Sequence, residues 1–412
     1  MRTRSGLAAM LAGVAVLASC SFAGAAAESG CSSAPSTPTA LSSTDPASPQ
    51  AGAGRTSASP VTITQGGVYT GNWSSPNGDL AAVTIDTDQP VVLCGCHLFG
   101  AADLVETVRP HTKITIENCR ATGSVIPGAT PGRFLSANGF DSVVVRNNDV
   151  EGTGGIYLLQ YSGTDPADAV RIEHNQVRNI GGGRSRDGGP GVSDTGLVQF
   201  LQLDKVEAVP QVEVSWNEVV NSAGRSRVED VINVFSSQGT PSSPIRIHDN
   251  YIDGAYPVDP EREAGYSGGG IIVDGDARSA WVSITGNTVL RTTNHGVAIA
   301  TGHDNVVSGN TVVASGLTDD GRIAVAQNVG GYVSNLAQAP GFERNVMRDN
   351  VFGWYLAHKA VRNDWWLPDC GEGCTGNTSI RPGSVITVDD EAAARRAWQD
   401  AAVAQQIQVG PQ

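Results

Sequence analysis

Val145-Arg-Asn-Asn148-Asp-Val150 decides the fold, because the same arrangement returns along the chain. An apolar residue is followed by two variable residues, an asparagine, one more residue and usually a second apolar residue. Asparagine fills the slot at Asn148, Asn175, Asn217, Asn250, Asn287, Asn310, Asn350 and, in a degenerate copy, Asn377, whereas two earlier copies carry Cys96 and Cys119. A fixed motif at variable spacing is typical of a solenoid whose coils carry inserted loops.

The residues on either side of each slot alternate between apolar and polar, so one face of each strand points to a common interior. Stacked asparagine side chains can hydrogen-bond one another and the backbone of the turn, which satisfies polar groups in a buried bend. We therefore expect the asparagine series to be structural. The pattern predicts an all-β, parallel β-helix of about ten coils over residues 61–383.

This repeat resembles that of the right-handed parallel β-helix proteins that include pectate lyases and polygalacturonases. The resemblance covers roughly residues 61–380 and implies a right-handed solenoid. The segments Gly66–Trp73, Glu229–Asn233 and Ser236–Thr240 more narrowly resemble a bacterial family of secreted β-helix proteins that has no assigned activity. Carbohydrate-active members of the wider group bind polymers on one sheet, between walls of inserted loops, and the resemblance implies such a groove here.

The cysteines fit an exported protein, since disulfides persist outside the cell. If Leu93 stacks on Ile116, Cys96 lies over Cys119 at a strand spacing of about 4.8 Å, within disulfide reach. Cys370 and Cys374 form a second predicted pair near the far end of the chain. The pairing of Cys31 and Cys94 is left open, and the tight Cys94-Gly-Cys96 spacing argues against zinc.

The N-terminus reads as an export signal. Residues 1–20 hold a short basic region, an apolar stretch too short to span a bilayer, and Leu17-Ala-Ser-Cys20, which resembles a lipobox with Cys20 as the acylated residue. Ala25-Ala-Ala27 offers the alternative of ordinary cleavage and release as a soluble secreted protein. Residues 21–60 have the Ser, Thr, Pro and Ala composition of a disordered tether. We expect a lipoprotein on the outer side of the cell membrane, or a secreted protein.

The opposite end changes character over residues 384–412. Asp389–Ala402 has helical composition, with acidic residues leading and Arg395, Arg396 and Trp398 following, which predicts a C-terminal helix that covers the last coil as a cap. A cap of this kind would shield the exposed edge of a solenoid.

Composition excludes some partners. The chain of 412 residues has a formal net charge of −14 and only three lysines, so binding of nucleic acid or anionic lipid through a general positive field is not expected. We predict a monomer that meets a membrane only through its lipid anchor, with a polysaccharide as substrate or ligand.

A further strand in each coil supplies the candidate groove floor. These strands align as Gly155–Leu159, Gly196–Phe200, Asp230–Val234, Gly270–Asp274, Gly296–Ala300 and Arg322–Ala326. With the second and fourth positions inward, Asp230, Asp274 and Arg322 point outward. The long insertions at residues 181–195 and 254–269 would wall this sheet.

Asp274 and Asp276 are the leading catalytic candidates, with Asp230 and His303 close enough to assist. On a continuing strand the two carboxylates would share a face roughly 6 to 7 Å apart, near the separation of an inverting glycosidase pair. They could instead hold Ca²⁺ for β-elimination from a uronate, with a neighbouring Arg as base. His295 and His303 could transfer protons in either scheme. The competing interpretation is that Asp274-Gly-Asp276 only shapes a turn.

Substrate contacts are expected from Tyr157, Tyr266, His295 and Arg322. The two tyrosines would stack on sugars, because pyranose rings present apolar faces to aromatic groups. Further stacking faces are predicted at Tyr161, Tyr256 and Phe200.

Three classes of function remain open at this point: a polysaccharide hydrolase or lyase, a non-catalytic glycan-binding protein, and a structural surface protein or adhesin. An intact acid pair on the groove floor would favour the enzyme. The glycan, its linkage and the choice between hydrolysis and β-elimination are not determined by the sequence.

Overall fold

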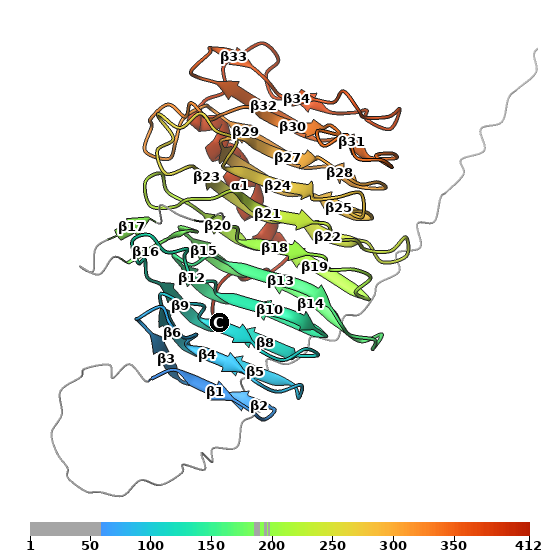
Figure 1. Cartoon of the computed structure of the whole chain (residues 1–412). Helices are drawn as coiled ribbons and strands as arrows, with labels where there is room; N and C mark the ends of the chain where they lie inside the picture. The colour runs from blue at the N-terminus through green and yellow to red at the C-terminus, as the bar shows by residue number, and fades with distance from the viewer. Residues whose placement is uncertain (1–58, 185–189, 193–195, 197) are drawn as a thin grey trace, which may run out of the picture. The chain divides into compact units, whose positions relative to one another are not determined.

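The structure is a computed structural model that describes residues 59–184, 190–192, 196 and 198–412. The predicted signal segment, Cys20, Cys31 and nearly all of the predicted tether lie outside the described residues. Within them the chain forms a right-handed parallel β-helix, in which successive strands enter three long sheets in rotation (Figure 1). Strand pairs within the three sheets are parallel except β32 and β33, which are antiparallel.

Sheet 1 runs in spatial order through β1 (Val61–Ile63), β4 (Val83–Ile85), β7 (Val105–Thr107), β10 (Leu135–Phe140), β13 (Ile156–Tyr161), β18 (Leu201–Asp204), β21 (Asp230–Phe235), β24 (Gly269–Asp274), β27 (His295–Ile299), β30 (Val329–Val333) and β34 (Trp365–Trp366). Sheet 2 runs through β2 (Gly67–Tyr69), β5 (Val91–Cys94), β8 (Lys113–Glu117), β11 (Ser142–Arg146), β14 (Ala169–Glu173), β19 (Gln211–Ser215), β22 (Ile245–His248), β25 (Val282–Thr285), β28 (Val306–Ser308) and β31 (Val346–Arg348).

Sheet 3 runs through β3 (Asn72–Ser75), β6 (His97–Gly100), β9 (Arg120–Gly123), β12 (Asp149–Glu151), β15 (Gln176–Arg178), β20 (Glu218–Val220), β23 (Tyr251–Ala255), β26 (Thr288–Thr292), β29 (Thr311–Ala314), β32 (Val351–Leu356) and β33 (Val361–Arg362), and β35 (Thr378–Ser379) also pairs with β32. A short antiparallel hairpin of β16 (Gly182–Arg184) and β17 (Pro190–Val192) branches off before β18. The one helix of the described residues is α1 (Val388–Ala404).

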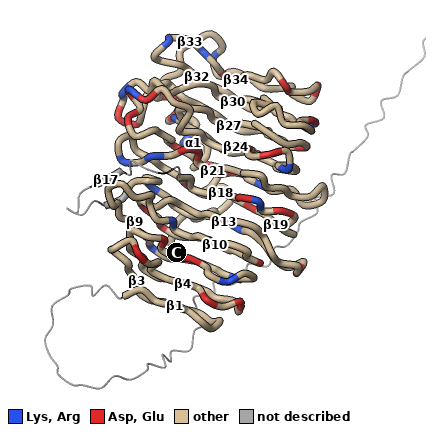
Figure 2. Tube along the Cα trace, in the orientation of Figure 1, with Lys and Arg blue, Asp and Glu red and all other residues tan. Residues whose placement is uncertain are grey.

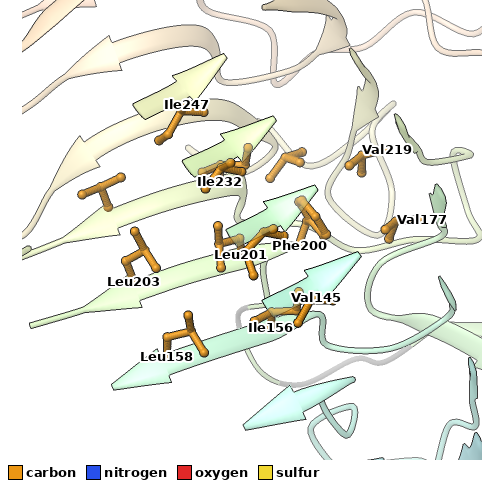
Figure 3. Packing of buried hydrophobic residues seen from close by; sticks show 14 of the residues in the cluster. Val145, Ile156, Leu158, Val177, Phe200, Leu201, Leu203, Val219, Ile232 and Ile247 are labelled. Atoms are coloured by element: carbon orange, nitrogen blue, oxygen red, sulfur yellow. The ribbon is translucent and has the colours of Figure 1, made fainter. Parts of the chain in front are cut away.

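The core lies inside the solenoid, where equivalent apolar residues of successive coils stack on one another. In sheet 1 one inward row is fully buried from coil to coil: Ile156, Leu201, Ile232, Ile271 and Val297. Figure 3 shows part of this packing, with Ile156, Leu201 and Ile232 on adjacent strands. Complete burial of such a side chain contributes about 1.5–3 kcal/mol, so repetition of the row stabilises the stack of coils.

The asparagine ladder lies at the bend between sheets 2 and 3. Each asparagine donates its Nδ2–H to Oδ1 of the next, over 2.8–3.0 Å, from Asn148 to Asn377. Each Nδ2 also donates to a backbone carbonyl of the preceding coil, as from Asn250 to Val214 (2.8 Å). The predicted structural role of the series therefore agrees with its hydrogen bonding.

The predicted register at the first coils is confirmed. Leu93 pairs with Ile116, and Cys96 and Cys119 form a disulfide with their Cα atoms 4.5 Å apart. The Sγ atom of Cys119 also accepts the backbone N–H of Cys96, so it replaces the asparagine oxygen at this step of the ladder. Cys370 and Cys374 are joined as well.

The C-terminal helix forms, but it lies against the side of the solenoid rather than over its last coil. Trp398 and Ala394 of α1 pack on an apolar outer stripe of sheet 3 that includes Tyr251, Leu290 and Val313. This stripe belongs to interior coils. Because it offers an apolar surface, α1 packs there rather than over the end of the stack.

A buried ion network also holds the helix in this position. Arg291 bridges Asp253 (2.5 Å) and Glu391 of α1 (3.2 Å), and the other oxygen of Glu391 accepts the backbone N–H of Ser315 (2.6 Å). The tail beyond the helix continues toward earlier coils, where Gly410 donates to the carbonyl of His174 (2.8 Å).

Among the described residues, no helix has the length and apolar character needed to cross a membrane.

Candidate functional site

The outer face of sheet 1 carries a row of side chains in register across the coils, here called the outer row. It consists of Glu106, Ser136, Tyr157, Gln202, Asn233, Ile272, Ala298, Tyr332 and Trp366. Because strands neighbour one another at about 4.8 Å, an extended ligand along this row would cross coils rather than follow one strand. The strands of sheet 1 carry the charged residues Glu106, Asp204, Asp230 and Asp274, and most of the charged residues coloured in Figure 2 lie elsewhere on the chain.

Asp230 and His295 approach each other beside this row, at the beginnings of β21 and β27. They reach across Gly269 of the intervening strand β24, with 3.6 Å between Asp230 Oδ1 and His295 Nε2. A Cβ atom on Gly269 would lie 2.1 Å from Asp230 Oδ1 and 2.7 Å from His295 Nε2. The absence of a side chain at Gly269 is therefore what permits the pair.

The pair is buried and incompletely hydrogen-bonded. The side chain of His295 is 0% exposed, and neither of its ring nitrogens has a hydrogen-bond partner. Asn233 donates from Nδ2 to Asp230 Oδ2 (3.2 Å), but its own Oδ1 is buried without a partner. Buried polar atoms without partners are costly to folding, so their concentration here suggests a site made for something other than stability.

Burial keeps both members of the pair uncharged near neutral pH. Desolvation, together with the charges of Glu229 and Asp274, raises the pKa of Asp230 to about 8, against the opposing hydrogen bond from Asn233. Desolvation also lowers the pKa of His295 to about 3. Although the two groups lie within ion-pair distance, they therefore face each other as a carboxylic acid and a neutral imidazole.

Two further carboxylates surround this pair. Glu229 is half-buried, and burial raises its pKa, while Gln199 donates to Glu229 Oε2 over 2.6 Å. Asp274 is half-buried at the end of β24 on the outer side of sheet 1, as predicted. A carboxylic acid with further carboxyl groups near it is the kind of grouping that acid and base catalysis uses.

An aromatic surface continues from His295 toward the last coils. Tyr332 meets the His295 ring edge to face at 5.5 Å between centroids, and Trp366 lies 6.4 Å beyond Tyr332. Tyr332 is buried among Ile272 and Ala298, whereas Trp366 is 48% exposed. The exposed ring of Trp366 therefore offers apolar contact to a sugar ring.

Asp276 does not join Asp274 on this face. Strand β24 ends at Asp274, and Gly275 follows with φ +99°, so the continuing strand that the prediction assumed is absent. The carboxylate of Asp276 instead receives both Nε and Nη2 of Arg278 (2.8–3.1 Å) and is half exposed. The guanidinium lowers the pKa of Asp276.

The other proposed proton carrier, His303, belongs to the turn that leaves sheet 1. Its Nδ1 lies 2.6 Å from Asp304 Oδ2, and its ring meets Trp281 edge to face. Neither partner is part of the Asp230 and His295 pair.

Arg322 is not on sheet 1. The strand expected at Arg322–Ala326 is a loop, and the sixth aligned strand is instead β30. Arg322 pairs with Asp320 (2.8 Å) and Glu261 (3.3 Å).

The predicted aromatic contacts lie in four different settings. Tyr157 does lie on the outer row, where its hydroxyl donates to Asp204 (2.7 Å) and Arg133 covers its ring at 4.4 Å. Tyr266 is 83% exposed in the loop before β24. Phe200 and Tyr256 are buried, so they cannot offer free stacking faces as predicted. Tyr161 bonds Asp168 through its hydroxyl (3.1 Å).

Sequence reasoning assigned no role to Asn233, Gln199, Glu229, Gly269, Tyr332 or Trp366. The Trp365-Trp366 pair did carry a signal, because two adjacent tryptophans on one strand must place one ring inside and one outside. Trp365 packs on the core, and Trp366 lies on the outer row.

A Ca²⁺ site at Asp274 and Asp276 does not fit this arrangement. Arg278 occupies both oxygens of Asp276, and in the described part of the chain no three His, Cys, Asp or Glu residues are grouped as metal ligands.

Sheet 1 also has a cavity of about 380 Å³ near its first coils, and neither Asp230 nor His295 lines it. Its wall includes Asp79, Asp103, Glu106 and Arg133. Glu106 is the member of the outer row that borders it.

These features define the class of protein as a right-handed parallel β-helix with a buried acid and imidazole on the outer face of one sheet. Comparison with protein-family models, curated proteins and solved structures found no match to this chain.

Proposed function

We propose that this protein cleaves an extracellular polysaccharide on the outer face of sheet 1, as a carbohydrate-active β-helix protein related in kind to the pectate lyase and polygalacturonase group. The observation that carries the proposal is Asp230, a buried carboxyl group with a pKa of about 8 beside an imidazole without hydrogen-bond partners. A carboxylic acid that stays protonated near neutral pH is suited to protonate a leaving oxygen.

In a hydrolytic reaction, Asp230 would donate its proton to the glycosidic oxygen as the bond from that oxygen to the anomeric carbon breaks. A water molecule would add its oxygen to the anomeric carbon and give a proton to a second carboxyl group acting as base, for which Asp274 and Glu229 are the candidates near Asp230. The polymer would meet the outer row where that row is exposed, with Trp366 as a stacking surface.

The proposal also includes where the protein acts, which is at the cell surface. Export with a lipid on Cys20 would hold the β-helix at the cell surface, where a polymer substrate is available, and the protein would act as a monomer.

Non-catalytic glycan binding is the second candidate. The exposed ring of Trp366 next to Tyr332 favours it, because a stacking surface binds sugars whether or not cleavage follows. A structural surface protein or adhesin is the remaining alternative.

A polysaccharide panel tests the proposal. The purified protein should release reducing ends from at least one polymer, and Asp230→Asn should reduce that release by about 100-fold or more, the usual contribution of a general acid. Asp276→Asn, at a carboxylate outside the site, is the matched control and should retain turnover. Binding of a polymer without release of products would support the glycan-binding alternative.

A further inference from the structure

The charges around Asp230 and His295 restrict the kind of sugar that the site can accept. The charged groups that shift the pKa values of Asp230, Glu229 and Tyr332 are carboxylates. Arg227, in the turn before β21, is not among them. A uronate carboxylate placed here would meet like charge in a region of low dielectric, which is strongly unfavourable.

Three cationic side chains along this side of the solenoid have anionic or aromatic partners, whereas Arg227 keeps a buried Nη1 without a hydrogen-bond partner. Lys205 lies 3.5 Å from Asp204, and Arg278 pairs with Asp276 and Glu207. Arg133 covers the ring of Tyr157, and the charge of Asp103 acts on it. Neither Arg133 nor Arg278 therefore offers a free bidentate guanidinium to a carboxylate, the arrangement that recognises such groups best.

The unpaired atoms at the pair suit hydroxyl groups instead. A neutral imidazole offers one N–H donor and one nitrogen acceptor, and neither ring nitrogen of His295 has a partner. Asn233 Oδ1 and Gln199 Oε1 add two buried acceptors without partners. Sugar hydroxyls both donate and accept, so they can satisfy donors and acceptors at one site.

We infer that the polymer cleaved on this face is a neutral glycan whose sugars present free hydroxyls, and that cleavage is hydrolytic; this inference rests on the proposed function. β-Elimination requires removal of a proton from the carbon next to a uronate carboxyl group, and a neutral sugar has no such carboxyl. Hydrolysis consumes one water for each glycosidic bond broken and leaves one new reducing end.

Two sets of polymers test the inference with the full chain. The neutral set contains a β-glucan, a mannan and an arabinan, and the anionic set contains polygalacturonate and alginate. Reducing ends report any cleavage, and ultraviolet absorbance of unsaturated uronates reports β-elimination. We expect turnover of at least one neutral polymer to exceed that of either polyuronate by tenfold or more, with no unsaturated product.

The outcomes separate the two proposals. Preferential cleavage of a polyuronate, by either chemistry, would overturn the inference while leaving glycan cleavage in place. Absence of both cleavage and binding with every polymer would contradict the proposed function and the inference with it. Loss of neutral-polymer turnover in His295→Ala, with turnover kept in Asp276→Asn, would support both.

Discussion

Two polar regions of this β-helix are buried, and they differ in whether their polar atoms have hydrogen-bond partners. In the ladder between sheets 2 and 3, Asn250 donates to Asn287 and to the carbonyl of Val214, and its oxygen accepts from Asn217. On the outer face of sheet 1, both ring nitrogens of His295 and the oxygen of Asn233 have no partner. In the first region the polar groups stabilise the stack of coils through hydrogen bonds. In the second region the buried polar atoms are left without hydrogen-bond partners.

The comparison separates structural from functional polar residues without reference to related sequences. A ladder asparagine is satisfied by the next coil, so its substitution should damage folding. A residue of the outer-face pair has polar atoms that make no hydrogen bond in the folded protein. Its substitution should therefore reduce activity more than it reduces stability.

Asn250→Leu should produce the largest loss of stability. The variant leaves the carbonyl of Val214 and the amide groups of Asn217 without their partner, and each such buried group costs about 1–3 kcal/mol. We expect the free energy of unfolding in urea to fall by about 3 kcal/mol or more. Asn138→Leu, at an exposed position of β10, is the control and should change it by less than about 0.5 kcal/mol. Equal effects of the two substitutions would contradict a stabilising ladder.

Gly269→Ala should separate stability from activity at the outer face. Its Cβ would overlap Asp230 Oδ1 and His295 Cε1 at 2.1 and 2.4 Å, so the pair must move apart. We expect a cost of about 1–3 kcal/mol from overpacking and loss of turnover on any confirmed substrate. Gly265→Ala, where a Cβ meets nothing within 4 Å, should keep both properties. Retained turnover in Gly269→Ala would argue against the pair as the active centre.

Asp276→Asn should have the smallest effect. The Asp276 and Arg278 pair is about half exposed on both sides, and surface pairs of this kind contribute about 0–1 kcal/mol. Stability in urea and turnover should both stay close to the wild type. A large loss of turnover would indicate that Asp276 takes part in catalysis and that the active site lies near the end of β24.

The sequence predicts the ladder side of the fold better than the outer face for a physical reason. Asparagine in a fixed slot marks the register of each coil, which is why Leu93 over Ile116 and the bond between Cys96 and Cys119 were correctly expected. Sheet 1 has no such marker. Loops of different length enter it, so the alignment placed Gly196–Phe200 where β18 begins only at Leu201.

The misalignment also shaped the predicted site. Asp230 was aligned with Gly270, but it pairs with Gly269, one residue earlier. That single step places Asp230 opposite the glycine that separates it from His295. Asp274 was correctly placed on the outer face, since Ile271 and Val273 belong to the core and Ile272 to the outer cluster, so that Asp274 follows on the outer side. The helix α1 was predicted from composition, but its position depended on an apolar stripe of sheet 3 that no local pattern identified.

The pH dependence of stability in Asp230→Asn tests the central claim most directly, because it needs no knowledge of the substrate. A folded-state pKa of about 8, above the usual value of 3.8, means that the stability of the wild type falls as pH rises from about 4 to about 8. Asparagine mimics the protonated acid and does not titrate. The variant should match the wild type in urea unfolding near pH 4 and exceed it by several kcal/mol near pH 9, since a rise in pKa from 3.8 to about 8 corresponds to about 5–6 kcal/mol. A difference that does not change with pH, or a variant less stable than the wild type at pH 9, would contradict a buried, un-ionised Asp230.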